Sequence, residues 1–162
     1  MVLIAFVMLA SVPVSAQAQG PEGKDFGFGI ILIQPLGGTI KYWTSPTNAF
    51  VADIGSSYFG ALRLQFDYLW HFNPFHSYIV KMYAGPGLAI GFGAGREIFV
   101  NQHGDEFVTS DNSTGVGIRA IFGINVIPQR TPLEMFFELG PLIGISPTGV
   151  GLDLALGIRF YP

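Results

Sequence analysis

Ten charged residues of this chain occupy one phase of an alternating pattern, and ion pairing is the chemistry that they can do. Five are basic and five are acidic, so they can neutralise one another in a confined space. Successive side chains of a β-strand point to opposite faces, which places all of them on the same face of their strands. An unpaired buried charge is strongly destabilising, so we expect a mutual network. The residues are Lys41, Asp53, Arg63, Asp67, Lys81, Arg119, Glu134, Glu138, Asp153 and Arg159.

The network is expected to hold its elements together and to fill the space between them. A general diffusion pore needs about 16–18 strands, twice what this chain can supply, so we expect no open channel. A small conductance gated by rearranged pairs is the alternative. The sequence does not give the individual pairs, but we expect three bases to pair with three acids in some combination. The bases are Arg63, Arg119 and Arg159, and the acids are Asp67, Glu138 and Asp153.

Catalytic or metal chemistry has weaker support in this sequence. Hydrolysis would need a serine, a histidine and an acid close together. The chain has His71, His76 and His103, and none is expected near the outer rim with a serine two residues away. No metal-ligand spacing appears either. We therefore predict no enzyme activity, no cofactor and no metal site.

The elements that position these charges are predicted to be β-strands of a membrane protein. Charged residues make up 12% of the chain and hydrophobic residues 49%, which leaves too few charges for an ordinary water-soluble surface. After the N-terminal segment, no stretch has the ~18 unbroken apolar residues of a membrane helix. A closed barrel is the other structure that crosses a bilayer, so we predict an all-β, closed, eight-stranded, antiparallel, up-and-down transmembrane β-barrel.

Proline and glycine clusters divide the chain into eight segments of strand length. Turns are predicted at 35–38 and 146–149, among others. Pro86 and Pro141 fall inside predicted strands, and we expect them to mark bulges or the rim of the barrel. The first seven predicted strands are 26–33, 39–43, 49–57, 61–71, 77–93, 115–127 and 133–143, and the eighth follows the last turn.

Alternation alone does not decide which face looks inward, since a soluble lipocalin-like carrier has the same period with its faces reversed. Three observations favour charges inside. The other phase carries no charge, as lipid contact requires. Glycine and alanine share the charged phase, which suits a narrow lumen. Aromatic residues gather near strand ends, as in an interfacial girdle: Tyr42, Trp43, Tyr58, Tyr68, Trp70, Tyr78 and Phe160.

The N-terminal segment reads as a signal peptide. Residues 1–14 are uncharged and apolar, and Ala16 and Ala18 occupy the A-x-A positions of a cleavage site. We predict a signal peptide at 1–18 and a barrel domain at 19–162, with cleavage after Ala16 or a buried N-terminal element as alternatives. The lack of a basic cluster argues against nucleic-acid binding. Residues 94–114 are predicted to form a long acidic loop outside the cell, which is a solvated connection or, alternatively, a site for a cation or a host partner.

The chain resembles the small eight-stranded outer-membrane barrels of the OmpX and OmpA membrane-domain type. The resemblance rests on 67–72, on the glycine-rich strand from Tyr83, on 132–138 and on Gly157 to Tyr161, and it covers about 24–162. It implies a monomer in the outer membrane of a Gram-negative bacterium, in contact with lipid and lipopolysaccharide. It also implies recognition of the C-terminal strand by the barrel-assembly machinery. A structural or surface-interaction role is expected, and a lipid A-modifying enzyme is the family's alternative.

Overall fold

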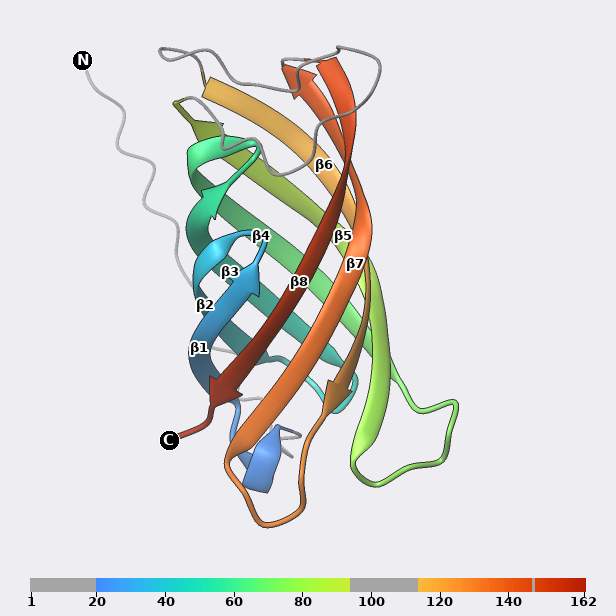
Figure 1. Cartoon of the computed structure of the whole chain (residues 1–162). Coiled ribbons are helices and arrows are strands. Elements are labelled where there is room, and N and C mark those ends of the chain that lie inside the picture. Colours follow the sequence, from blue (N-terminus) through green and yellow to red (C-terminus); the bar gives the residue numbers. More distant parts are fainter. Residues whose placement is uncertain (1–19, 94–113, 147) are drawn as a thin grey trace, which may run out of the picture.

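The structure, a computed structural model, describes residues 20–93, 114–146 and 148–162 and is a closed antiparallel barrel (Figure 1). Each strand pairs with the next, and β8 closes the barrel against β1. The predicted all-β, eight-stranded, up-and-down architecture is confirmed. The strands are β1 (Phe26–Ile33), β2 (Leu36–Trp43), β3 (Asn48–Ser57), β4 (Gly60–Phe72), β5 (Val80–Phe92), β6 (Thr114–Val126), β7 (Leu133–Ser146) and β8 (Thr148–Phe160).

Burial alternates along the strands with the period that the sequence predicts. In β7, every second residue from Glu134 to Gly144 is buried, and the residues between them are exposed. The inward set carries the charges and the small residues. The outward set carries Leu, Ile, Phe and Met. The hydrophobic pattern therefore fixes the register, because a shift of one residue would put every side chain on the wrong face.

Two predicted turns are wrong because main-chain pairing continues through them. β2 begins at Leu36, which pairs with Ser56, so the predicted turn at 35–38 shrinks. β8 begins at Thr148, which pairs with Ile145, so the predicted turn at 146–149 is likewise shorter. At the other end of the barrel, β5 begins at Val80 rather than at residue 77. In a closed barrel a strand has partners on both sides, and this extends pairing into glycine-rich segments.

The two mid-strand prolines mark neither a bulge nor the rim, which corrects the prediction. Pro86 pairs with Ala120 on one side, and Pro141 pairs with Leu152. On the opposite side of each proline, the pairing between strands is interrupted for two residue pairs and then resumes in the same register. Each proline thus lies where its missing N–H interrupts one ladder only. The register shifts lie elsewhere, at Gly55/Ser57 and Val116/Gly117.

The two ends of the barrel differ in their connections. Residues 44–47, 73–79 and 127–132 connect strands at the end where the C-terminus lies (Figure 1). At the other end, residues 34–35 and 58–59 are the described connections, so they are tight. The 3-10 turn η1 (Pro21–Gly23) precedes β1, and Lys24 Nζ donates to the Pro162 carbonyl at 2.8 Å.

No helix in the described part of the chain is long and apolar enough to cross a membrane. The predicted signal peptide at 1–18 lies outside the described residues, and so does nearly all of the predicted loop at 94–114.

Candidate functional site

The lumen is lined by the charged phase of the alternating pattern. Nine of the ten predicted residues are buried, and all nine project inward from their strands. They come from β2, β3, β4, β6, β7 and β8, so the charges link strands that are not neighbours. The exception is Lys81, which is half-buried at the start of β5. Its ammonium lies 5.8 Å from the centre of the Trp43 ring, and the described residues give it no ion pair.

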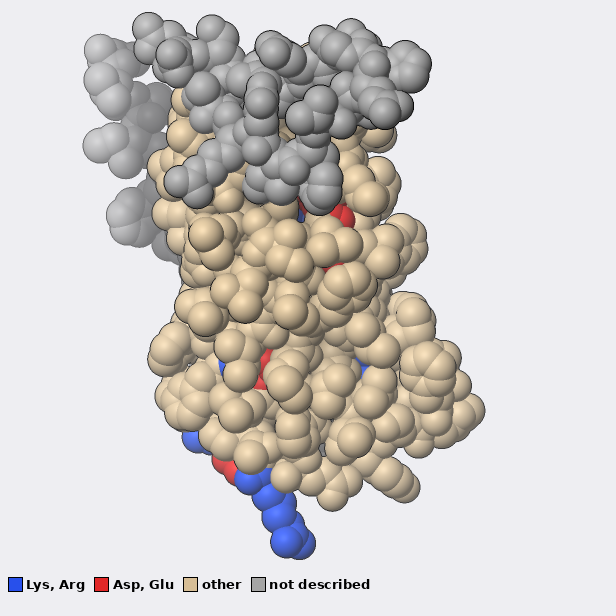
Figure 2. All heavy atoms as spheres, in the orientation of Figure 1, with Lys and Arg blue, Asp and Glu red and all other residues tan. Residues whose placement is uncertain are grey.

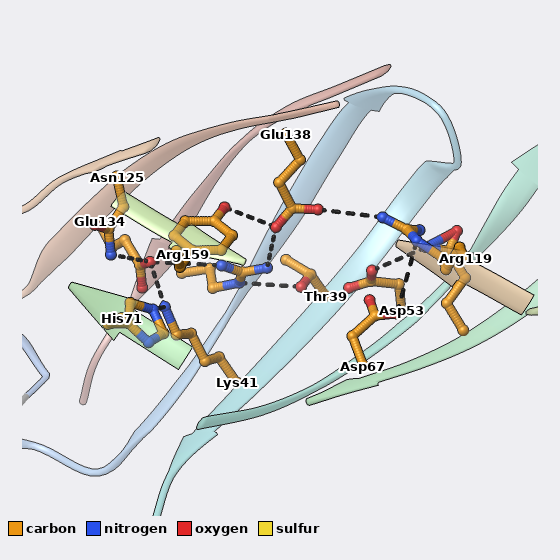
Figure 3. A network of polar contacts seen from close by, with 12 residues as sticks. Thr39, Lys41, Asp53, Asp67, His71, Arg119, Asn125, Glu134, Glu138 and Arg159 are labelled. Carbon is orange, nitrogen blue, oxygen red and sulfur yellow. Dashed lines mark hydrogen bonds and ion pairs between the residues drawn. The ribbon is translucent and has the colours of Figure 1, made fainter. Parts of the chain in front are cut away.

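Seven of the buried charges form a continuous series of alternating sign, which we call the charge ladder. From the C-terminal end of the barrel towards the opposite end, each residue lies within ion-pair distance of the next. The distances are 2.7, 3.6, 3.9, 3.5, 3.5 and 2.5 Å in that order. Figure 3 shows most of the series. The members are Lys41, Glu134, Arg159, Glu138, Arg119, Asp153 and Arg63.

Glu134 is the most fully bonded carboxylate of the ladder. Its Oε1 accepts from Lys41 Nζ at 2.7 Å and from Asn125 Nδ2 at 2.9 Å. Its Oε2 accepts from the Tyr161 hydroxyl, which in turn accepts from Trp43 Nε1 at 3.1 Å. Burial, reinforced by the Glu134 carboxylate, raises the pKa of Tyr161, so its phenol remains a donor. This cluster ties the end of the chain to β2 and β7 across the closure of the barrel.

The other end of the ladder is a bidentate ion pair. Arg63 Nη1 donates to Asp153 Oδ1 at 2.9 Å, and Nη2 donates to Oδ2. The Tyr58 hydroxyl donates to the same carboxylate at 2.8 Å, and burial followed by the Asp153 charge raises the pKa of this phenol. The Arg63 guanidinium also lies 5.7 Å from the centre of the Phe59 ring. Planar, bidentate pairing is the strong form of a carboxylate–guanidinium contact.

The middle of the ladder is more loosely bonded. Glu138 accepts from the Tyr83 hydroxyl at 2.8 Å and lies between Arg119 and Arg159 at ion-pair distances. Arg119 reaches three acids at 3.5–3.7 Å, which are Asp67, Glu138 and Asp153. Its Nε and Nη1 nonetheless make no hydrogen bond to any described residue. The structure therefore brings together all six residues that were predicted to pair, in a shared network rather than in separate pairs.

Two acids lie beside the ladder and have few hydrogen-bond donors. Asp53 Oδ2 accepts a long hydrogen bond, 3.4 Å from Gln65 Nε2, and its Oδ1 has no partner among the described residues. Asp67 lies 3.7 Å from Arg119 Nε, and neither of its oxygens makes a hydrogen bond to the part of the chain that the structure describes. Most buried polar atoms in proteins are hydrogen-bonded, so these oxygens are unusual.

Aromatic rings packed over inward glycines fill the rest of the lumen. The Tyr83 ring covers Gly123, its partner on the next strand, and the Phe136 ring covers Gly157 in the same way. The Arg159 guanidinium stacks on Phe136 at 3.8 Å from the ring centre. Any added Cβ at these glycines would collide with the ring above it. Glycine on the charged phase therefore makes room for large inward side chains.

His71 belongs to the ladder's first cluster rather than to a catalytic site. Its Nδ1 lies 3.2 Å from the Thr47 carbonyl, which can only accept, so this nitrogen carries the proton. Its Nε2 lies 3.0 Å from Lys41 Nζ and therefore accepts, which makes the ring neutral. His76 is exposed in the turn after β4, and His103 lies outside the described residues.

Several inward partners were not predicted from the sequence, and one residue was predicted on the wrong face. His71, Tyr83, Asn125 and Tyr161 lie on the charged phase of their strands, and that phase is the signal that could have found them. Trp43 was predicted to join an interfacial girdle, but it is only 2% exposed and points inward to Tyr161. Trp43 is two residues after Lys41 in β2 and therefore shares its inward face, so the alternating pattern predicts its position.

The outer wall is apolar and carries a hollow. Figure 2 shows almost no charge on the visible side of the wall, with Lys, Arg, Asp and Glu gathered at one end of the barrel. An apolar hollow of about 630 Å³ lies over β2 to β6, where the small Ala52 stands between Ile40 and Phe66 on the neighbouring strands.

No protein-family model matches this chain, and no curated protein matches it. Among the described residues, no group of three or more His, Cys, Asp or Glu side chains is placed to hold a metal ion.

Proposed function

We propose that this protein is an integral outer-membrane β-barrel, with a structural or surface-interaction role and a lumen closed by the charge ladder. The observation that carries the proposal is the reversed polarity of the barrel. Arg63, Arg159 and Lys41 have no exposed surface, whereas large apolar side chains on every strand are exposed. Hydrocarbon around the wall explains both facts, since water would favour the opposite arrangement.

The exposed apolar side chains are large and contiguous. Phe50, Phe66 and Phe122 are more than half exposed, as are Ile30 and Ile54. Soluble monomers rarely expose apolar patches larger than a few hundred Å², and here such residues occur on all eight strands. The hollow around Ala52 is bounded by such residues, and we propose that hydrocarbon fills it.

A soluble lipocalin-like carrier is the alternative, and the contents of the lumen argue against it. A carrier of this size keeps an interior space for one small ligand. Here Arg63, Arg119, Phe136 and Tyr83 extend into that space and contact residues of other strands. Release of a ligand-sized space would require buried ion pairs to break, at about 3–5 kcal/mol each.

A charge placed on the outer wall tests the membrane proposal. Leu139 is the seventh of the fourteen residues of β7 and is 44% exposed on the outer face. In a bilayer, Leu139→Arg is expected to lower stability by about 2–4 kcal/mol, because an arginine near the midplane is poorly solvated. The measurement is the fraction of refolded protein in phospholipid vesicles, read from its heat-dependent gel mobility.

The matched control is Tyr78→Arg, which places the same charge in the turn between β4 and β5, where the side chain is 87% exposed. We expect this variant to refold like the wild type. If the wild type folds in detergent-free buffer and Leu139→Arg is as stable as the control there, the barrel is a soluble one and the proposal is wrong.

The surface-interaction role is assigned to the acidic loop at 94–114. The connections 34–35 and 58–59 at the same end are too short to offer a binding surface. From Arg96 to Asp111 the loop carries one basic and four acidic residues, so a cationic partner suits it. Removal of the loop is expected to abolish such binding while the barrel still refolds. We propose a monomer without enzyme activity, inserted through recognition of its C-terminal strand.

A further inference from the structure

Among the residues that the structure describes, the buried acids of the lumen outnumber the buried bases by one. The bases are Lys41, Arg63, Arg119 and Arg159, and the acids are Asp53, Asp67, Glu134, Glu138 and Asp153. Lys81 does not restore the balance, because it is half-buried and forms no ion pair among the described residues. His71 does not restore it either, since its hydrogen bonds require a neutral ring. A net buried charge is strongly unfavourable in a water-poor interior.

The surplus charge can be located, because the acids differ sharply in their bonding. Glu134 accepts from three donors, Asp153 is held by a bidentate guanidinium, and Glu138 accepts from Tyr83. Asp53 and Asp67 instead keep three oxygens for which the described residues offer no hydrogen bond. The surplus therefore falls on these two side chains, which are 3% exposed each.

Asp53 and Asp67 are close neighbours on the same inner face. Asp53 pairs with Gln65 in the β3–β4 register, and Asp67 is two residues further along β4. This makes the two acids diagonal neighbours on adjacent strands, and Figure 3 shows their carboxyl groups side by side. Two carboxylates at such a site cannot both ionise easily, and one of them keeps its proton.

We propose that Asp53 and Asp67 form a proton-binding pair that holds one proton within the closed lumen at neutral pH. The proton turns one carboxylate into a donor and lowers the buried acid count to match the four bases. The Gln65 Oε1 atom, which is buried and has no partner in the described ranges, is an additional acceptor beside the pair. Release of the proton to water would leave two carboxylates side by side near Arg119, which also pairs with Glu138 and Asp153.

The groups that face the pair come from every strand packed against it. Arg119 on β6 and Arg159 on β8 favour ionisation, as does the Thr39 hydroxyl on β2. Glu138 on β7 opposes ionisation of both acids, and Arg63 on β4 favours ionisation of Asp67. Both guanidinium groups are shared with other acids of the ladder, Arg119 with Asp153 and Glu138, and Arg159 with Glu134 and Glu138. The ladder therefore leaves the pair under-compensated.

Infrared spectroscopy of the full chain, refolded in detergent micelles, tests this inference. A protonated carboxyl gives a C=O stretching band that a carboxylate lacks and that shifts in D₂O. We expect the folded wild type to show this band at neutral pH. Asp53→Asn and Asp67→Asn should each abolish it, because either change leaves four buried acids for four buried bases. Asp25→Asn, before β1, should leave the band unchanged.

Three outcomes would overturn the inference. One is a folded wild type without the band at neutral pH. Another is a band that survives in both asparagine variants. The last is failure of both variants to refold where Asp25→Asn refolds, because an amide is the neutral substitute for the protonated acid. None of these depends on the membrane location of the barrel, so the two proposals fail independently.

Discussion

The Glu134 carboxylate accepts hydrogen bonds from β2, β6 and the C-terminal residues, so its charge holds one end of the ladder together. Glu134→Gln would leave the fully buried Lys41 ammonium without its carboxylate. The expected loss of stability is about 3–5 kcal/mol, the usual effect of breaking a buried pair from one side. Unfolding in urea, followed in detergent micelles, measures it.

Two further variants separate the pair from the general effect of substitution. Lys41→Met combined with Glu134→Gln removes both charges, and we expect it to recover most of the lost stability. Lys81→Met serves as the control, because Lys81 is half-buried without an ion pair among the described residues, and a change within about 0.5 kcal/mol is expected. A Glu134→Gln variant as stable as this control would show that the cluster does not stabilise the barrel.

Gly87 makes the space that the Asp67 carboxylate and the Arg119 side chain occupy. A Cβ added there would lie 2.9 Å from Arg119 Cγ and 3.0 Å from Asp67 Cγ. Both side chains are hemmed in by other buried groups, so Gly87→Ala is expected to destabilise by about 1–3 kcal/mol through overpacking. In Gly38→Ala the nearest atoms would be 3.7 and 3.9 Å away, so this matched strand glycine should tolerate the change. Equal urea midpoints for the two variants would contradict the packing account.

At the scale of the strands, the mid-strand prolines show how a ladder tolerates a missing donor. Pro86 lies beside the interval in which β4 and β5 do not pair, so Pro86→Ala should change stability by less than about 1 kcal/mol. Leu88, two residues on, pairs with Phe66 and with Ile118. Leu88→Pro is therefore expected to lower stability by about 3 kcal/mol or more. Both effects are measured as the yield of folded protein that shows heat-dependent gel mobility. Equal yields for Pro86→Ala and Leu88→Pro would contradict this explanation of the prolines.

The strands themselves were predictable because their signal is local. Alternation over 26–33 gave the bounds of β1. The ends of β3, β4 and β6 differ from the predicted ends by at most one residue. The start of β2 at Leu36 was not predictable, because it depends on pairing with Ser56 on another strand rather than on local turn preference. The same holds for the start of β8 at Thr148.

The inward position of the charges was equally predictable, but their partners were not. Nine of the ten charges on the polar phase point into the lumen, and this follows from a period of two. That Arg119 contacts Asp67, Glu138 and Asp153 depends on how the barrel brings β4, β6, β7 and β8 together. The stagger of strands around a barrel sets these distances, and the sequence pattern does not contain it.

At the scale of the whole molecule, the charge ladder joins five strands across the lumen from Lys41 to Arg63. Because the ladder and the stacked rings fill the interior, we expect planar-bilayer recordings of the wild type to show no stable open channel. Arg119→Ala combined with Asp67→Ala would remove the central contact without changing the net charge. This double variant is expected to pass a small ionic current, well below that of a porin with about 16–18 strands.

This comparison requires that the wild type and the double variant insert equally into the bilayer. Heat-dependent gel mobility of each protein in vesicles measures the inserted fraction. Large, steady openings in the wild type would contradict a closed lumen. Silence in both proteins would mean that the rings, rather than the central ion pairs, block the path. Tyr83 and Phe136 would then be the residues to truncate, since each spans the lumen over a glycine of the adjacent strand and touches the ladder through Glu138 or Arg159.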